Sequence, residues 1–378
     1  STGMLVIRAW LANNPERRKY LKHLVGLAPA TWGSPLAQMG NSVLGSIVRG
    51  NHQFGPDFLN AGTLVLDALE IGSKFTWDLA HRDILGPEPL FTTDPSTPYV
   101  AIFIGNTAYS GIKELVDKPG TDGTVRWSGC SLNTRKLIVD LTKPAAGLQA
   151  QMMPWPEERL SVPMFAVDGK NHTTLLLDPG DDLADRVAAF FAIDSGALFN
   201  SWVEKTSTEM APALEKMKQN SDGWQQFIVH VMDEFGEGAP DYAIDVFNQD
   251  PRPLDEDALA AADIEIFDAD VHAYQLDQSF RCFHVQLPQG FMGTPQVLWI
   301  RLLASSGTDL ISYRGYDSAG AVTVGSQAPI VLDISHLAAG ADALFCPFTT
   351  TLIEIRLNRL PSASVMTVGP YASALTIK

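Results

Sequence analysis

The sequence has few cysteines and no pattern in which they could act together. Cys130, Cys282 and Cys346 are far apart in the 378-residue chain, and no C-x-x-C or H-x-x-x-H spacing occurs. Such spacings are typical of zinc sites, so we expect no metal, and nothing else in the sequence calls for a cofactor. An odd number of scattered thiols is typical of a reducing compartment and favours the cytoplasm. Secretion stays open as an alternative, because the sequence does not show the N-terminal segment that would carry a signal peptide.

Long apolar runs and an excess of positive charge are also missing. No segment reaches the ~18 uninterrupted apolar residues of a membrane-spanning helix, although 46% of the residues are hydrophobic. The chain has 27 Lys and Arg against 43 Asp and Glu, a formal net charge of −16. Because nucleic-acid-binding proteins present basic patches, this charge argues against a nucleic-acid partner. The length and composition fit an enzyme with room for two domains.

The chain opens on a serine that matches part of a catalytic motif. Ser1-Thr2-Gly3 precedes an apolar stretch at helical spacing, residues 4–12. This is the second half of G-x-S-x-G, in which a serine sits on the sharp turn between a strand and a helix. The strand and the first glycine of the motif are absent, so the sequence reads as one that begins on its own nucleophile. A serine before a helix is also a common N-cap, which leaves a structural role open.

Apolar runs alternate with helical segments through the first half. The run at residues 23–28 is typical of a strand in a covered parallel sheet, and it ends in a loop rich in turn formers, residues 29–36. Runs at 99–104 and 162–167 predict two more strands, and helices are expected at 181–191 and 201–217. This alternation indicates a doubly wound α/β sheet.

Two later loops carry candidate catalytic side chains. Asp122 lies in Gly120-Thr121-Asp122-Gly123-Thr124-Val125, where Asp-Gly predicts a turn with the acid at its apex. An acid that only caps its own turn is the structural alternative. His172 follows the expected strand 162–167, and Asp168, four residues before it, competes with Asp122 as its partner.

In this order, Ser1, Asp122 and His172 resemble the triad of serine lipases and esterases of the α/β-hydrolase fold, including phospholipase-like members. The loops at 29–35 and 120–125 have forms found in such lipases, and the resemblance covers residues 1 to about 195. It implies that a Ser-Asp-His triad cleaves acyl or lipid esters through an acyl-enzyme, with the Thr2 backbone N–H in the oxyanion hole. It also implies that the early strands and the second oxyanion donor precede Ser1.

The remaining sequence predicts a cap and a second domain. Short amphipathic stretches at about 40–98 lie where α/β-hydrolases commonly carry a cap, although a plain connecting helix pair fits them too. Beyond the linker helices at about 181–218, the apolar period changes to two. We therefore expect a partial α/β-hydrolase domain at 1–219 and a β-sandwich at 220–378, open to peripheral contact with lipid or protein. Its predicted strands include a hairpin of 224–232 with 242–247, and further strands at 282–287, 297–303, 330–334 and 350–357.

Two other functions use the same residues. Ser1 could be the nucleophile of an N-terminal-nucleophile amidohydrolase, with its own α-amine as the base. The chain could also be an inactive hydrolase remnant that carries a binding sandwich. The apolar helix after Ser1 and the lipase-like loops favour the ester hydrolase.

Overall fold

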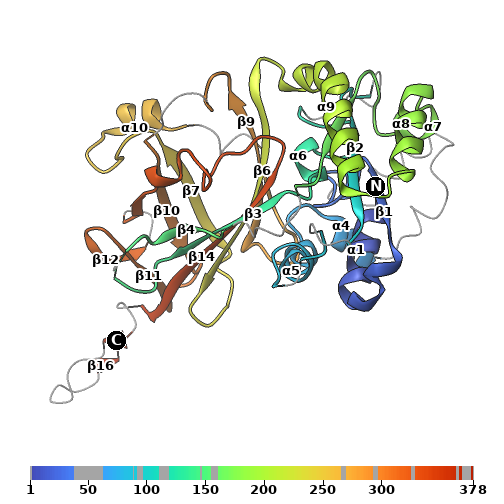
Figure 1. Ribbon diagram of the computed structural model, residues 1–378. Helices are drawn as coiled ribbons and strands as arrows, with labels where there is room; N and C mark the ends of the chain where they lie inside the picture. Colours follow the sequence, from blue (N-terminus) through green and yellow to red (C-terminus); the bar gives the residue numbers. More distant parts are fainter. Residues whose placement is uncertain are drawn as a thin grey trace.

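The computed structural model describes most of the chain, and its helices and sheets lie in successive layers (Figure 1). Ser1 and residues 38–62 of the predicted cap lie outside the described residues. The described ranges are 2–37, 63–87, 89–91, 97–109, 119–144, 147–154, 161–264, 270–292, 297–324, 328–362, 366–367 and 376–377.

A parallel sheet of three strands forms the α/β part, in the order β1-β2-β5. Its central strand is the most apolar, and residues 100–104 are fully buried because both faces of the sheet are covered. The predicted α/β alternation is confirmed here. The strands are β1 (His23–Leu27), β2 (Tyr99–Gly105) and β5 (Met164–Val167).

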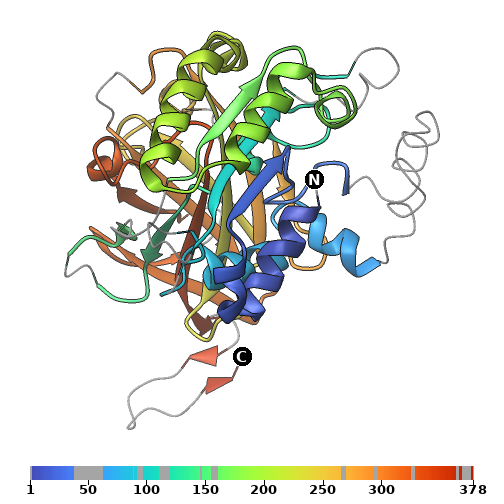
Figure 2. The ribbon, with the colours of Figure 1, turned by 45° about the vertical axis from the view of Figure 1, so that its right-hand side comes forward.

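Helices cover both faces of this sheet (Figure 2). On one face, Met4 of α1 (Gly3–Asn13) packs against Gly26 of β1. On the other, Trp202 of α9 (Gly196–Lys218) meets the rings of Phe103 and Phe165. The shorter helices of this part are η1 (Pro15–Tyr20), α4 (Thr63–Leu69), α5 (Lys74–Asp83), α6 (Trp127–Cys130), α7 (Thr174–Leu177) and α8 (Asp181–Phe191).

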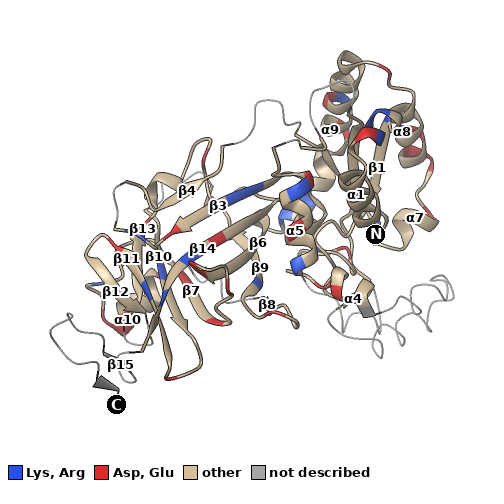
Figure 3. Ribbon diagram, turned by 90° about the horizontal axis from the view of Figure 1, so that it is seen from below, with Lys and Arg blue, Asp and Glu red and all other residues tan. Residues whose placement is uncertain are grey.

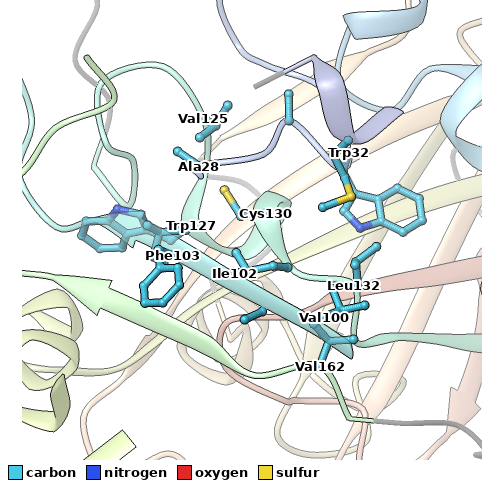
Figure 4. Close-up of a cluster of buried hydrophobic side chains, with 14 of the residues drawn as sticks. Ala28, Trp32, Val100, Ile102, Phe103, Val125, Trp127, Cys130, Leu132 and Val162 are labelled. Atoms are coloured by element: carbon cyan, nitrogen blue, oxygen red, sulfur yellow. The ribbon is translucent and has the colours of Figure 1, made fainter. Parts of the chain in front are cut away.

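The buried residues between these layers come from several loops as well as from the sheet (Figure 4). Val100 and Ile102 of β2 contribute, together with Trp32 from the loop after β1 and Val125 and Trp127 from the segment before β3. The indole Nε1 of Trp127 donates to the carbonyl of Gly105 at 3.0 Å. This core therefore includes residues of the loops at the end of the sheet as well as residues of the strands.

A larger mixed sheet lies beside this core, in the order β12-β11-β14-β6-β9-β8, with β3 and β4 added at β14. The first part of β14 lies between β3 and β6 and is parallel to both. The strands are β3 (Thr134–Asp140), β4 (Ala150–Met152), β6 (Ser221–Asp233), β8 (Val271–Ala273), β9 (Phe280–Pro288), β11 (Ile311–Asp317), β12 (Gly320–Val324) and β14 (Thr350–Pro361).

A third, antiparallel sheet has the order β13-β10-β7 and corrects one prediction. The predicted hairpin of 224–232 with 242–247 is wrong, because β7 pairs with β10 instead of β6. Pro240 lacks an N–H and cannot continue a ladder, and Tyr242 and Ile244 bury their side chains toward the larger sheet. The elements of this part are β7 (Asp241–Phe247), α10 (Glu256–Ala262), β10 (Trp299–Ser305), β13 (Ile330–Asp333), η4 (Ser335–Leu337), β15 (Met366–Thr367) and β16 (Thr376–Ile377).

The larger sheet contributes to two hydrophobic cores. Ile228 and Leu352 face the core shared with α1 and β2, whereas Val229 and Ile353 face the core shared with the third sheet. Since β3 precedes the predicted boundary at 219–220 and β14 follows it, this sheet contains strands from both sides of that boundary. A separate β-sandwich domain at 220–378 stays a prediction.

Candidate active site

Asp122 lies in a tight loop between β2 and α6, residues 120–126, which we call the acid loop. The loop is closed by hydrogen bonds from Asp122 N to Val125 O (3.2 Å) and from Trp127 N to Gly120 O (3.0 Å). Gly120 and Gly123 have φ of +74° and +92°, a conformation that suits glycine. A Cβ at Gly123 would also overlap the ring of Tyr109. The two glycines therefore determine the backbone conformation of the acid loop.

The carboxylate of Asp122 is fully buried and uses its two oxygens differently. Oδ1 accepts the backbone N–H groups of Thr124 (3.0 Å) and Val125 (2.9 Å). Oδ2 lies 2.9 Å from Nδ1 of His172. The acid therefore caps its own turn with one oxygen and binds the histidine with the other.

His172 lies in the loop that follows β5, residues 168–173, which we call the histidine loop. Its backbone N–H donates to the carbonyl of Asp122 at 3.0 Å, and its side chain is 2% exposed. Because a carboxylate only accepts, Nδ1 carries the hydrogen in the neutral ring, and Nε2 carries the lone pair. Asp122 therefore orients His172 so that its Nε2 can accept a proton.

The end of β2 packs directly against the backbone of the histidine loop. A Cβ at Gly105 would overlap the carbonyl of Lys170, so only glycine allows this approach without a shift of backbone. Thr107 N donates to the same carbonyl at 3.0 Å. Asn171 Oδ1 accepts the N–H groups of Thr173 (3.0 Å) and Thr174 (2.9 Å) and caps the turn that leads into α7.

Asp168, the competing acid, has other partners. Its carboxylate is exposed and accepts from Lys216 Nζ at 2.6 Å and from Asn106 Nδ2 at 3.0 Å. The hydrogen bond from Lys216 holds the pKa of the Asp168 carboxyl below its ordinary value. Of the two acids that the sequence offered, Asp122 is the one bonded to His172.

The start of α1 lies close to the same region. Ser1 lies outside the described residues; Thr2 is half-buried, and its carbonyl accepts the N–H groups of Leu5 (3.0 Å) and Val6 (3.3 Å). Gly3 and Met4 share the lining of a cavity of about 360 Å³ with Leu176 of α7, the helix that follows His172. The first turn of α1 and the segment after His172 are therefore close in space.

Arg8 fixes α1 in this position, a role that its place in an apolar stretch did not reveal. Its guanidinium is fully buried and binds both carboxylate oxygens of Asp83 in α5, at 2.7 and 3.1 Å. A third hydrogen bond, of 2.8 Å, reaches the carbonyl of Thr31 in the loop after β1. Helix α5, predicted as part of a cap, thus packs on α1 inside the core.

An apolar groove of about 620 Å³ opens beside Thr2. Its walls come from α1, α4, α5 and the turn after β8, and Leu64 and Leu276 are 83% and 67% exposed. Asp67 is its one charged lining residue among the described residues. The groove residues are Thr2, Leu5, Val6, Ala9, Leu64, Val65, Asp67, Ala68, Leu69, Phe75, Tyr274 and Leu276.

Other contacts around the acid loop escaped the sequence analysis. Arg126 is buried and donates to Asp270 at 2.7 Å, which ties the loop to the start of β8. The phenol of Tyr109 lies between the acid and histidine loops. No local pattern in the sequence indicates either contact. Within the described ranges, His, Cys, Asp and Glu form no group of three that could hold a metal.

This architecture is a mixed α/β fold that is shared with known protein structures. Two solved structures of the phospholipase PlaB from Legionella pneumophila share it, each with 19% sequence identity, covering 100% of this chain and 80% of that chain. One has a TM-score of 0.73, and the other, in complex with thio-NAD, has 0.71. No protein-family model and no curated protein sequence matches the chain. At this identity the likeness is one of fold.

No helix in the described part of the chain combines the length and the apolarity that a bilayer crossing requires. That further strands precede Ser1 stays a prediction.

Proposed function

We propose that this protein is a serine hydrolase that cleaves carboxylic esters of lipids. The observation that carries the proposal is the buried Asp122–His172 pair, held at 2.9 Å in loops that follow strands of a parallel sheet. Ligands of open α/β sheets bind outside the carboxyl ends of the strands, which is where these loops lie. The shared fold with a phospholipase supports the same class of reaction.

In the proposed reaction, Ser1 Oγ attacks the ester carbonyl while its proton passes to Nε2 of His172. Asp122 holds the ring in the required tautomer and stabilises the imidazolium that forms. The tetrahedral intermediate then expels the alcohol, which takes the proton from His172, and leaves an acyl group on Ser1. Water, deprotonated by His172, hydrolyses this acyl-enzyme and restores the hydroxyl.

The negative oxygen of the intermediate needs donors. We propose the backbone N–H of Thr2 as one of them, because it lies at the start of α1, where the helix dipole favours negative charge. The second donor is proposed to come from residues before Ser1, as the resemblance to the family implies.

The apolar groove is the proposed site of the acyl chain. Thr2, which follows the proposed nucleophile in the sequence, is among its lining residues, so a chain that lies along Leu5, Val6 and Leu64 would have its carbonyl near Thr2. Burial of each methylene contributes about 0.8 kcal/mol. A groove of this kind therefore favours long acyl chains over acetyl esters.

The test is ester hydrolysis with phosphatidylcholine vesicles and 4-nitrophenyl esters of increasing chain length. Ser1→Ala, His172→Gln and Asp122→Asn should each lower kcat by several orders of magnitude without additivity, because the three act as a unit. A fluorophosphonate probe should label Ser1 in the unmodified protein. Asp168→Asn is the matched control and should retain activity, because its partners are Lys216 and Asn106.

The same variants separate the alternative. An amidohydrolase that uses the α-amine of Ser1 as its base would keep its activity in His172→Gln and Asp122→Asn. Undiminished ester hydrolysis in Ser1→Ala would remove the proposed mechanism.

A further inference from the structure

Tyr109 connects the two loops that carry Asp122 and His172. It follows β2, and its phenol oxygen lies 3.1 Å from Oγ1 of Thr124 in the acid loop and 2.9 Å from Oγ1 of Thr173 in the histidine loop. Thr173 directly follows His172, and the backbone N–H of Thr124 binds Oδ1 of Asp122. One hydroxyl thus reaches both sides of the carboxylate–imidazole pair.

The ring of Tyr109 is also fitted to the acid loop. A Cβ on Gly123 would overlap Cδ2 and Cε2 of the ring, so the phenol lies directly on the loop backbone. A phenol hydroxyl has one hydrogen to donate and lone pairs to accept. It can therefore donate to one threonine hydroxyl and accept from the other at the same time, which makes a continuous chain from one loop to the other.

The acid loop also has a separate anchor. Ser34, in the loop after β1, donates its Oγ hydrogen to the carbonyl of Thr124 at 2.6 Å. This bond fixes the acid loop to the loop after β1 and makes no contact with the histidine loop. Apart from the Asp122–His172 contacts themselves, Tyr109 is the described side chain that bonds to both loops.

We propose that Tyr109 is a positioning residue of the active site, whose hydroxyl fixes the distance between Asp122 and His172. Its kinetic consequence rests on the proposed function, but its effect on the Asp122–His172 hydrogen bond does not. Tyr109 touches neither Asp122 nor His172 through its hydroxyl, so it acts through Thr124 and Thr173.

Tyr109→Phe keeps the ring against Gly123 and removes only the hydroxyl. Loss of one to two neutral hydrogen bonds corresponds to about a tenfold effect, so we expect kcat for ester hydrolysis to fall about tenfold with little change in KM. Thr173→Val should have a similar effect, and Thr173→Ser should restore activity. The double variant Tyr109→Phe/Thr173→Val should be no worse than Tyr109→Phe alone, because Tyr109→Phe already removes the bond to Thr173.

A second measurement is independent of catalysis. In proton NMR, the hydrogen between His172 Nδ1 and Asp122 gives a downfield signal, assigned by its loss in His172→Gln. We expect this signal to broaden or move upfield in Tyr109→Phe and in Thr173→Val. Tyr99→Phe, at the opposite end of β2, is the control and should leave it unchanged.

The outcomes separate the two proposals. If the unmodified protein hydrolyses no ester but the signal changes in Tyr109→Phe, the proposed function fails and the positioning role stands. If Tyr109→Phe leaves kcat within twofold and the signal in place, the positioning role is overturned even in an active enzyme. If Tyr109→Phe does not fold, Thr173→Val gives the same decision.

Discussion

The ion pair of Arg8 and Asp83 allows a quantitative test of how α1 is held. Replacing Arg8 with Met removes three hydrogen bonds and leaves the Asp83 carboxylate without its cation, at 0% exposure. Breaking a buried pair in this way costs about 3–5 kcal/mol, because an uncompensated charge stays in the core. The contact of the guanidinium with the Trp32 ring, 5.6 Å away, adds roughly 1 kcal/mol.

Such a loss is a large part of the free energy of unfolding, which is about 5–15 kcal/mol for ordinary domains. The assay is urea unfolding followed by tryptophan fluorescence, with Trp32 beside the substituted residue as one reporter. Arg8→Met should lower the urea midpoint strongly. The double variant Arg8→Met/Asp83→Leu should recover much of the loss, because it removes both charges from the interior.

Two results would refute this reasoning. Arg8→Met within about 1 kcal/mol of the unmodified protein would mean that water reaches Asp83 and compensates its charge. A double variant less stable than Arg8→Met would mean that the residual carboxylate is not the source of the loss.

Three further predictions concern pH, the histidine loop and the groove. Burial lowers the pKa of His230 to about 4. As the pH falls from 6.5 toward 4, the unfolded chain binds a proton at His230 and the folded protein does not, so the free energy of unfolding decreases by roughly 3 kcal/mol. His230→Gln should therefore reduce the fall of the urea midpoint over that pH range. Gly105→Ala should lower kcat/KM about a hundredfold, because the new Cβ displaces the Lys170 carbonyl and the histidine loop with it. Glu70 accepts from His272 Nε2 at 2.7 Å and ties the end of α4 to β8, so Glu70→Ala should raise KM for long-chain esters.

Each of these has its own control. His336→Gln replaces a histidine whose Nε2 is bonded to a backbone carbonyl, and a flattening equal to that of His230→Gln would show that the effect is not local. Gly196→Ala, where a Cβ meets nothing within 4 Å, should leave kcat/KM unchanged. If Glu70→Ala raised KM equally for acetyl esters, Glu70 would not act through the shape of the groove.

Two of the strands that the sequence predicted, β2 and β5, are buried along most of their length. Residues 99–104 and 162–167 read as continuous apolar runs because helices cover both sides of their sheet. Strand β3 was missed because its sequence, TRKLIVD, mixes charges with apolar residues. Its Lys136 is nevertheless buried, since its Nζ donates to Glu354 Oε2 at 2.6 Å.

The buried ion pairs could not be predicted from the sequence. The partner of Lys136 lies 218 residues away in the sequence, and the partner of Arg8 lies 75 residues away. No local pattern therefore indicates either ion pair. Figure 3 shows basic residues, in blue, on both β3 and α5. Nζ of Lys136 in β3 lies 2.8 Å from Nε2 of His81 in α5. The proximity of Asp122 and His172, by contrast, could be predicted from the sequence, because each lies in a loop that follows a strand of the same sheet.

The place of β14 between β3 and β6 has a consequence for biosynthesis. The acid loop runs through α6 directly into β3, and the long parallel neighbour of β3 is made only from residues 350–361. A ribosome releases the chain from its N-terminal end, so Asp122 and His172 emerge long before the strand that completes the sheet beneath them. Closing such distant parallel pairs is slow. The sheet that continues from the acid loop through β3 is therefore completed only after residues 350–361 have emerged.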